Sequence, residues 1–486
     1  NGDYEFAVEA GWFDAMGIEY YFRGVDGSGN VGVSPDTTAT TNKYHKTFVK
    51  YDGANLPKLD LIKGSTGASG YQIISVPLEL SNKNIADNFE ELGTADNTAF
   101  RFLRYHSQPS EGWDEYPGGG LSALARGEGY FLNSLNAEEI TLLNGVAPAV
   151  DQSNLFELTL KPGWNQIGNP YTVQIQWKDV IAFNGTPTNV STKLTKYDNG
   201  YNTTDPDGII EPYKGGFVNV NGSSDVKLKV PFKGMTSGRT QRVGSDLSAQ
   251  NWEMPFTITQ GNISYNMGLI GMNEQASLSM DNFDLPMAPR LGEYVEATFD
   301  HPEHARKKFS QDVVPASDEF TWTFGVNSNL KGMAQLNWNN LGFGENEKEL
   351  FLQDLGTEQV INMRQVASYA FDPARSSRFR IYFGDDLEKK ISPARVTLTP
   401  TPNPATSKVQ INFSLPDQGA EHFVKIEIYD LVGRKMGTLV NEKMNPGFYS
   451  APWDATTAGE GMYVCRLAVI TGENQAMITE RIVIKK

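Results

Sequence analysis

The sequence predicts a mainly β protein that is built from several β-sandwich modules in series. A chain of 486 residues is long enough for about three domains or more. It contains 47 glycines, 20 tyrosines and 26 phenylalanines, a composition that suits strands joined by tight turns. Short runs of alternating apolar residues recur between turn-forming residues, which is the pattern of half-buried strands. We therefore expect multidomain, Ig-like β-sandwich modules, with a tandem repeat in which short helices decorate the strands.

The charge and the cysteine content exclude several classes of protein. The formal net charge is −16, which disfavours nucleic acid as a partner because phosphates require clustered lysine and arginine. No run of 18 apolar residues occurs, so the sequence predicts no membrane-spanning helix. The single cysteine, Cys465, allows no intramolecular disulfide. Its place in an alternating strand predicts a buried thiol rather than a nucleophile.

Residues 1–58 look like part of a domain followed by a linker. The segments 4–8 and 18–25 have strand character, and Asp26-Gly27-Ser28-Gly29-Asn30 is a turn sequence. The second strand and its turn resemble the closing hairpin of a fibronectin type III-like sandwich, of which about half is missing. The chain begins at Asn1 without a charged and apolar leader. We expect either that an export signal has been removed or that more chain precedes it.

Residues 59–147 and 148–235 are predicted to be two copies of one module. The first contains Ile74-Ser75-Val76-Pro77 and the second Ile167-Gly168-Asn169-Pro170, so that the two prolines are 93 residues apart. A short amphipathic helix follows each proline, near 84–92 and near 177–183. Each copy then has a strand and, after a glycine, an aromatic residue in a further strand.

Residues 236–396 are predicted to form a larger β-sandwich. Alternating strands are expected at 252–259, 320–326, 335–338, 349–353, 366–371 and 378–382, separated by acidic and proline-bearing loops.

The known catalytic spacings are missing from the sequence. It has no His-Glu-x-x-His, Gly-x-Ser-x-Gly, Cys-x-x-Cys, phosphate-loop or dinucleotide motif. Of the five histidines, His301 and His304 flank Glu303 in a polar loop without a helix to orient them as metal ligands. We therefore expect no enzyme within these residues, although a catalytic domain upstream of Asn1 stays open.

Two acidic segments are candidates for Ca²⁺. Asp205 and Asp207 flank a proline before Gly208, which resembles the start of a calcium loop but lacks its distal bidentate glutamate. Asp281 and Asp284 form the second candidate. The alternative in both cases is that the aspartates only form turns.

Two aromatic pairs could form a sugar-binding platform. They are Trp113 with Tyr116 and Tyr197 with Tyr201, at roughly corresponding positions of the two copies. Rings at equivalent positions are equally expected in a core, which is the interpretation that we favour.

The last 87 residues, 400–486, predict a compact β-sandwich of six or seven short strands. The segment 400–404 is rich in proline and is predicted to be a rigid linker. We expect a core that contains Val409, Ile411, Ile426, Ile428, Tyr463 and Leu467. Gly433 lies where a hairpin turn requires a positive φ.

An ordered series of short motifs in this region resembles the type A C-terminal signal domain of type IX secretion cargo, from Bacteroidota-type bacteria. The motifs are Pro402-Asn403-Pro404-Ala405, Ile428-Tyr429-Asp430-Leu431-Val432-Gly433-Arg434, Gly447-Phe448-Tyr449, Trp453-Asp454, Gly461-Met462-Tyr463-Val464 and Ile482-Val483-Ile484-Lys485-Lys486. The resemblance covers only this region. It implies export through the periplasm and across the outer membrane to the cell surface, and later removal of the signal domain.

The resemblance also implies partners and recognition residues. The partners are the outer-membrane shuttle barrel PorV, the type IX translocon and, after processing, cell-surface lipopolysaccharide. The residues expected to carry recognition are Gly433, Arg434, Gly447, Gly461, Tyr463, Ile484, Lys485 and Lys486. We expect the terminal strand to be free and its two lysines to extend beyond the sandwich.

Together these observations predict a secreted or surface protein whose modules form a non-catalytic, adhesin-like stalk. Two alternatives stay open at this point. The modules could bind polysaccharide, or they could be the accessory tail of a hydrolase whose catalytic domain lies upstream.

Overall fold

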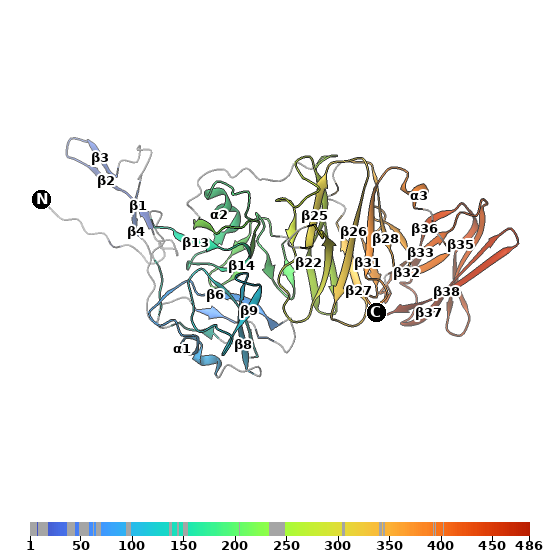
Figure 1. The fold of residues 1–486 in the computed structure, drawn as a ribbon, viewed down its shortest axis with the longest axis horizontal. Helices are drawn as coiled ribbons and strands as arrows, with labels where there is room; N and C mark the ends of the chain where they lie inside the picture. Colours follow the sequence, from blue (N-terminus) through green and yellow to red (C-terminus); the bar gives the residue numbers. More distant parts are fainter. Residues whose placement is uncertain are drawn as a thin grey trace. The chain divides into compact units, whose positions relative to one another are not determined.

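The computed structural model confirms a mainly β protein (Figure 1). It describes residues 7, 18–35, 44–47, 58–61, 63–64, 70–93, 99–135, 139–142, 145–148, 154–203, 205–232, 248–303, 307–339, 343, 346–391, 393, 395–401 and 403–486. The chain divides into two compact units, residues 1–242 and 243–486, and each is considered by itself.

The first described strands form two small antiparallel ribbons. β1 (Ile18–Tyr20) pairs with β4 (His45–Thr47), and β2 (Phe22–Val25) pairs with β3 (Val31–Ser34). The predicted turn joins β2 to β3, where the Asp26 carboxylate accepts hydrogen bonds from the backbone N–H groups of Ser28 and Asn30. The expected strand at 4–8 lies, apart from Ala7, outside the described residues. The fibronectin-like character of 1–58 stays a prediction.

The segment 59–147 is organised around a four-stranded antiparallel sheet. Its order is β6–β10–β8–β9, from β6 (Gln72–Ser75), β8 (Phe100–His106), β9 (Gly112–Tyr116) and β10 (Gly129–Ser134). Two short ladders accompany the sheet: β5 (Leu59–Asp60) with β11 (Glu139–Ile140), and β7 (Glu79–Leu80) with β12 (Gly145–Val146).

The helix predicted near 84–92 is present in two turns. It consists of α1 (Ile85–Asn88) and the 3₁₀ turn η4 (Glu90–Leu92). Asn84 caps α1, since its side-chain oxygen accepts a hydrogen bond from Ala86 N. The predicted apolar face is buried, with Ile85 and Phe89 both inside the core.

The segment 148–235 contains three two-stranded ladders and a helix. β13 (Phe156–Leu160) pairs with β20 (Val226–Val230), β14 (Gly163–Gly168) with β19 (Gly215–Val220), and β15 (Ile175–Gln176) with β18 (Ile209–Ile210). The helix is α2 (Trp177–Phe183), and the short strands β16 (Lys196–Tyr197) and β17 (Tyr201–Asn202) form a hairpin. Trp177, Val180 and Ile181 form the buried apolar face of this helix.

The two segments pair their strands in equivalent registers. Ser75, two residues before Pro77, lies opposite Gly129. Gly168, two residues before Pro170, lies opposite Gly215. Both segments also pair their outermost strands, β5 with β11 and β13 with β20. Superposition of the two whole modules remains a prediction.

The second unit begins with a large sheet whose main path has ten strands in the order β29–β28–β31–β26–β24–β25–β22–β21–β27–β30. Neighbours are antiparallel except β22 and β25, and β23 adds to β25. The strands are β21 (Trp252–Gln260), β22 (Ile263–Asn273), β23 (Leu285–Pro286), β24 (Val295–Asp300), β25 (Lys308–Pro315), β26 (Phe320–Ser328), β27 (Ala334–Trp338), β28 (Glu349–Asp354), β29 (Val360–Asn362), β30 (Ser368–Phe371) and β31 (Arg378–Gly384).

The sheet folds over an aromatic core. Trp252 of β21 contacts Trp322 of β26 with ring centroids 5.7 Å apart. Phe371 of β30 contacts Phe379 of β31 at 4.9 Å. These contacts join strands that lie far apart in the sheet order, as the predicted sandwich requires. The short helix α3 (Leu387–Lys390) follows β31.

Candidate functional site

The chain ends in a two-sheet sandwich. One sheet has the order β32–β33–β36, from β32 (Thr397–Thr401), β33 (Lys408–Leu415) and β36 (Gly447–Asp454). The other has the order β35–β34–β37–β38, from β34 (His422–Asp430), β35 (Lys435–Met444), β37 (Gly461–Thr471) and β38 (Asn474–Ile484). The six residues expected in the core are all buried: Val409, Ile411, Ile426, Ile428, Tyr463 and Leu467. Cys465 is also buried, and burial raises the pKa of its thiol to about 12.

The predicted rigid linker is in part a strand. Pro400 lies within β32, opposite Ile411 of β33. Proline is compatible with this position because β32 is the edge strand of its sheet and needs no further partner.

The expectation of a free terminal strand is wrong. β38 pairs with β37 along its whole length, and its end is fixed by the segment before β33. Ala405 N donates to Val483 O at 2.8 Å, and Lys485 N donates to Ala405 O at 2.9 Å. Lys486 donates from N to Glu460 Oε1 and from Nζ to Thr456 O, both at 2.7 Å. Both lysine side chains are nevertheless exposed.

The turn between β34 and β35 is held by Asp430. Its Oδ1 accepts hydrogen bonds from Val432 N at 3.1 Å and Arg434 N at 2.8 Å, and Arg434 Nε donates to Oδ2 at 3.1 Å. Gly433 has φ 84°, which favours glycine as the sequence predicts. The tip of the turn is apolar and exposed, with Leu431 at 66% and Val432 at 88%.

Strand pairing brings most of the predicted recognition residues to one end of the sandwich. Asp430 lies opposite Tyr463, and Tyr463 lies opposite Ile482. Gly433, Arg434, Gly461, Ile484, Lys485 and Lys486 all lie at or beside this row. Two predicted residues behave differently. Gly447 pairs with Leu415 at the opposite end, and Tyr463 is a core residue whose OH donates to Gly459 O at 2.9 Å.

A buried glutamate in the outer face of the four-stranded sheet was missed by sequence reasoning. Glu427 accepts hydrogen bonds from Tyr429 Oη at 2.7 Å and from Arg466 at 3.0 Å. Lys425 and Lys435 form ion pairs with its other oxygen at 2.9 and 3.4 Å. The hydrogen bond from Tyr429 and the nearby cations lower the pKa of Glu427 to about 2. The signal in the sequence was the alternation Lys425, Glu427, Tyr429 along one face of β34.

The two predicted calcium segments use their carboxylates within the fold. Asp205 forms an ion pair with Lys196 at 2.6 Å, and Asp207 forms one with Lys178 at 2.5 Å. In the second segment, Asp281 accepts from Ser277 N at 2.7 Å and Phe283 N at 2.8 Å.

Asp284 is buried and accepts from Val313 N at 3.0 Å, and its burial raises its pKa to about 7. Within the described part of the chain, no group of three or more His, Cys, Asp and Glu residues is placed to hold a metal ion. His304 lies outside the described residues.

The aromatic pairs proposed as a sugar platform pack against other side chains. Trp113, Tyr197 and Tyr201 are half-buried in a cluster of rings at the junction of the two modules. Tyr116 packs against the core of residues 59–147. The interpretation as core is therefore the one that the structure supports.

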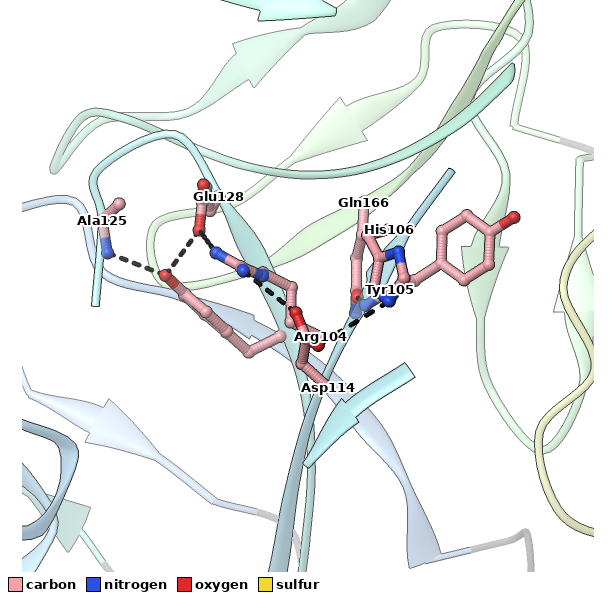
Figure 2. A network of polar contacts seen from close by, with 8 residues as sticks. Arg104, Tyr105, His106, Asp114, Ala125, Glu128 and Gln166 are labelled. Atoms are coloured by element: carbon pink, nitrogen blue, oxygen red, sulfur yellow. Dashed lines mark hydrogen bonds and ion pairs between the residues drawn. The ribbon is translucent and has the colours of Figure 1, made fainter. Parts of the chain in front are cut away.

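A polar network, also missed from the sequence, accompanies this junction (Figure 2). Arg104 forms ion pairs with Asp114 at 3.1 Å and with Glu128 at 3.0 Å. Glu128 accepts a hydrogen bond from Tyr130 Oη, which in turn accepts one from Ala125 N. The network is linked to the second module because Tyr105 N donates to Gln166 Oε1 at 2.8 Å. One guanidinium thus pairs with two carboxylates, and these contacts link β8 to β9 and to the residue before β10.

The chain is thus a mainly β protein that ends in a compact sandwich, whose last strand is held at its end by hydrogen bonds to Ala405. A family model described as a secretion system C-terminal sorting domain matches residues 401–485. The chain is therefore a type IX secretion cargo protein with a C-terminal signal domain, and its destination is the cell surface or the extracellular space. No helix among the described residues has the length and apolar character needed to cross a membrane.

Solved structures give only distant similarities. A β-glucuronidase from Parabacteroides merdae aligns at 11% identity and a TM-score of 0.16, over 32% of this chain and 29% of that one. Dimeric latent PorU from Porphyromonas gingivalis aligns at 14% identity and a TM-score of 0.18, over 48% of this chain and 30% of that one. The alignments thus span less than a third of either relative. No curated protein matches the sequence significantly.

Proposed function

We propose that the modules before the signal domain form a non-catalytic, adhesin-like stalk that export places on the cell surface. The observation that carries the proposal is a folded sorting domain at residues 401–485, preceded by β modules in series. Residues 59–235 contain charged and aromatic side chains that could have formed a binding site. These side chains instead contact other parts of the fold, as Asp205 does in its ion pair with Lys196.

The stalk proposal is tested by assaying the purified chain against peptide, ester and glycoside substrates. We expect no turnover. Turnover that one point substitution within this chain abolishes would contradict a non-catalytic role and would favour a hydrolase.

Recognition by the outer-membrane barrel PorV is proposed for one end of the sorting domain. This end carries the exposed side chains of Leu431 and Val432 together with the ammonium groups of Lys485 and Lys486. An apolar tip beside cations suits a partner surface that combines a hydrophobic recess with carboxylates. After removal of the sorting domain, we propose attachment of the remaining chain to cell-surface lipopolysaccharide.

The test substitutes side chains and leaves the core intact. Deleting Ile484 would remove a core residue, since it is 1% exposed, so unfolding and loss of recognition could not be separated. We therefore choose Val432→Asp combined with Lys485→Gln and Lys486→Gln, expressed in a host with the type IX system. We expect periplasmic accumulation and loss of co-purification with the barrel.

Lys443→Gln is the matched control, because Lys443 is exposed and pairs opposite Phe423, away from the row of Tyr463. Normal surface display of the triple variant would refute the proposed recognition surface. Attachment to lipopolysaccharide predicts a heterogeneous mass increase in the processed surface form, which mass spectrometry measures.

A further inference from the structure

A groove of about 530 Å³ lies on the second unit, between the outer face of its large sheet and the helix α3. Its floor comes from neighbouring strands: Thr321 of β26, Arg380 and Tyr382 of β31, and Gln353 of β28. Leu387 and Ile391, in and after α3, form one wall. The volume is within the range of about 300–1,000 Å³ that is usual for small-molecule sites.

The polar groups of the groove are not all used within the fold. Tyr382 Oη donates to Gln353 Oε1 at 2.8 Å, which orients the amide and leaves its NH₂ group without a partner among the described residues. Arg380 is exposed, and no ion pair or hydrogen bond joins it to another described side chain. At the rim, Lys390 and Glu319 form an ion pair.

Among the residues that the structure describes, Arg380 has no carboxylate partner, although the chain has 58 acidic and only 42 basic side chains. Its guanidinium is suited to a carboxylate, which it binds through two parallel hydrogen bonds. Beside it, the half-buried rings of Phe320 and Tyr382 and the aliphatic wall offer apolar surface, while Gln353 and Thr321 offer hydrogen-bonding groups.

We propose that this groove binds a carboxylate-bearing saccharide. A pyranose ring has an apolar face that packs on aromatic and aliphatic side chains, and hydroxyls around its edge that pair with amide and hydroxyl groups. A uronic acid also has a carboxylate, which the guanidinium of Arg380 would bind. An acidic peptide would also supply a carboxylate, but it would not use the ring-sized apolar surface and the amide together. The site goes beyond the proposed stalk function, and its test does not depend on export.

The experiment is calorimetric titration of the purified 486-residue chain with a tetramer of galacturonic acid at about physiological ionic strength. A neutral galactose tetramer and a tetraglutamate peptide serve as comparison ligands. We expect the acidic saccharide to bind at least tenfold more tightly than either. Absence of binding at millimolar ligand, or equal binding of the peptide, would overturn the proposal.

Arg380→Gln is the test variant and Arg378→Gln its matched control. Both arginines are exposed on the same face of β31, but Arg378 does not line the groove. A charge-assisted, bidentate contact is expected to contribute about tenfold or more to the affinity. The Arg380 variant should lose this factor, while the Arg378 variant should stay within about twofold of the parent. Equal losses of affinity in the two variants would show nonspecific attraction of the acidic saccharide and would overturn the proposed site.

Discussion

Phe131 and Phe217 lie with ring centroids 5.8 Å apart at the centre of the junction between residues 59–147 and 148–235. The contacts around them are reciprocal. Phe131 contacts Tyr197 of the other module, and Phe217 contacts Tyr105 of the other module. Within its own module Phe131 contacts Tyr71, as Phe217 contacts Trp164.

The backbone follows the same reciprocity. Ile74 forms a bridge with Lys214, and Ile167 forms one with Glu128. Ser75 N donates to Tyr213 O and Gly168 N donates to Gly127 O, both at 2.9 Å. The two modules thus exchange equivalent ring and backbone contacts across their junction.

The junction predicts that the two modules unfold together. Phe217 is fully buried, so Phe217→Ala should destabilise both modules by about 3–5 kcal/mol through lost packing and a cavity. Denaturant unfolding followed by hydrogen exchange would show loss of protection in β10 as well as in β19. Phe183→Ala is the control, because Phe183 is 44% exposed and should cost little. Unchanged protection in β10 would contradict a cooperative junction.

Ile428→Asp should unfold the sorting domain. Ile428 is fully buried in the centre of β34, and a carboxylate there would lack a partner, at a cost of several kcal/mol. The melting temperature of the C-terminal sandwich is the measurement. Val432→Asp, at an 88% exposed position, should leave it unchanged. A parental melting curve for the Ile428 variant would show that the core is assigned wrongly.

Glu427 should make the sorting domain sensitive to acid. Its folded pKa of about 2 is below the ordinary value of 4.5, so its contribution to stability is present above pH 4.5 and is lost as the pH falls toward 2. Glu427→Gln should be less stable than the parent at pH 7, and the difference should shrink through this window. Calorimetry between pH 7 and pH 2.5 tests it, with exposed Glu442→Gln as control. A stability difference between parent and variant that does not depend on pH would contradict the lowered pKa of Glu427.

His301 should make the stability of the protein sensitive to alkaline pH. The interaction with Asp312, 3.6 Å away, and that with Glu303, 3.0 Å away, raise its pKa to about 9. Because the folded pKa lies above the ordinary value of 6.5, the stabilisation is complete below pH 6.5 and is lost as the pH rises through 9. His301→Gln should therefore be less stable than the parent at pH 6, with the gap closing by pH 10 in thermal unfolding. A stability difference between parent and variant that stays the same from pH 6 to pH 10 would contradict the raised pKa of His301.

Local patterns in the sequence were enough to determine the fold class and the cores of single modules. Alternation placed Val409, Ile411 and Ile428 inside, because in a strand every second side chain faces the same side. The turn position of Gly433 was also located correctly, since its backbone requirement involves only a few neighbouring residues. The ordered motifs in 400–486 were enough to indicate the secretion domain.

Only the tertiary structure decided which of these local pieces meet. Ala405 fixes the chain end across about 80 positions, and the rings of Tyr197 and Phe131 meet from different modules. Pro400 can lie within a strand because β32 is the edge strand of its sheet. Asp205 forms an ion pair with Lys196, whereas Arg380 has no such partner among the described residues. Pairing between distant strands depends on how whole faces complement each other, and no local periodicity carries that information.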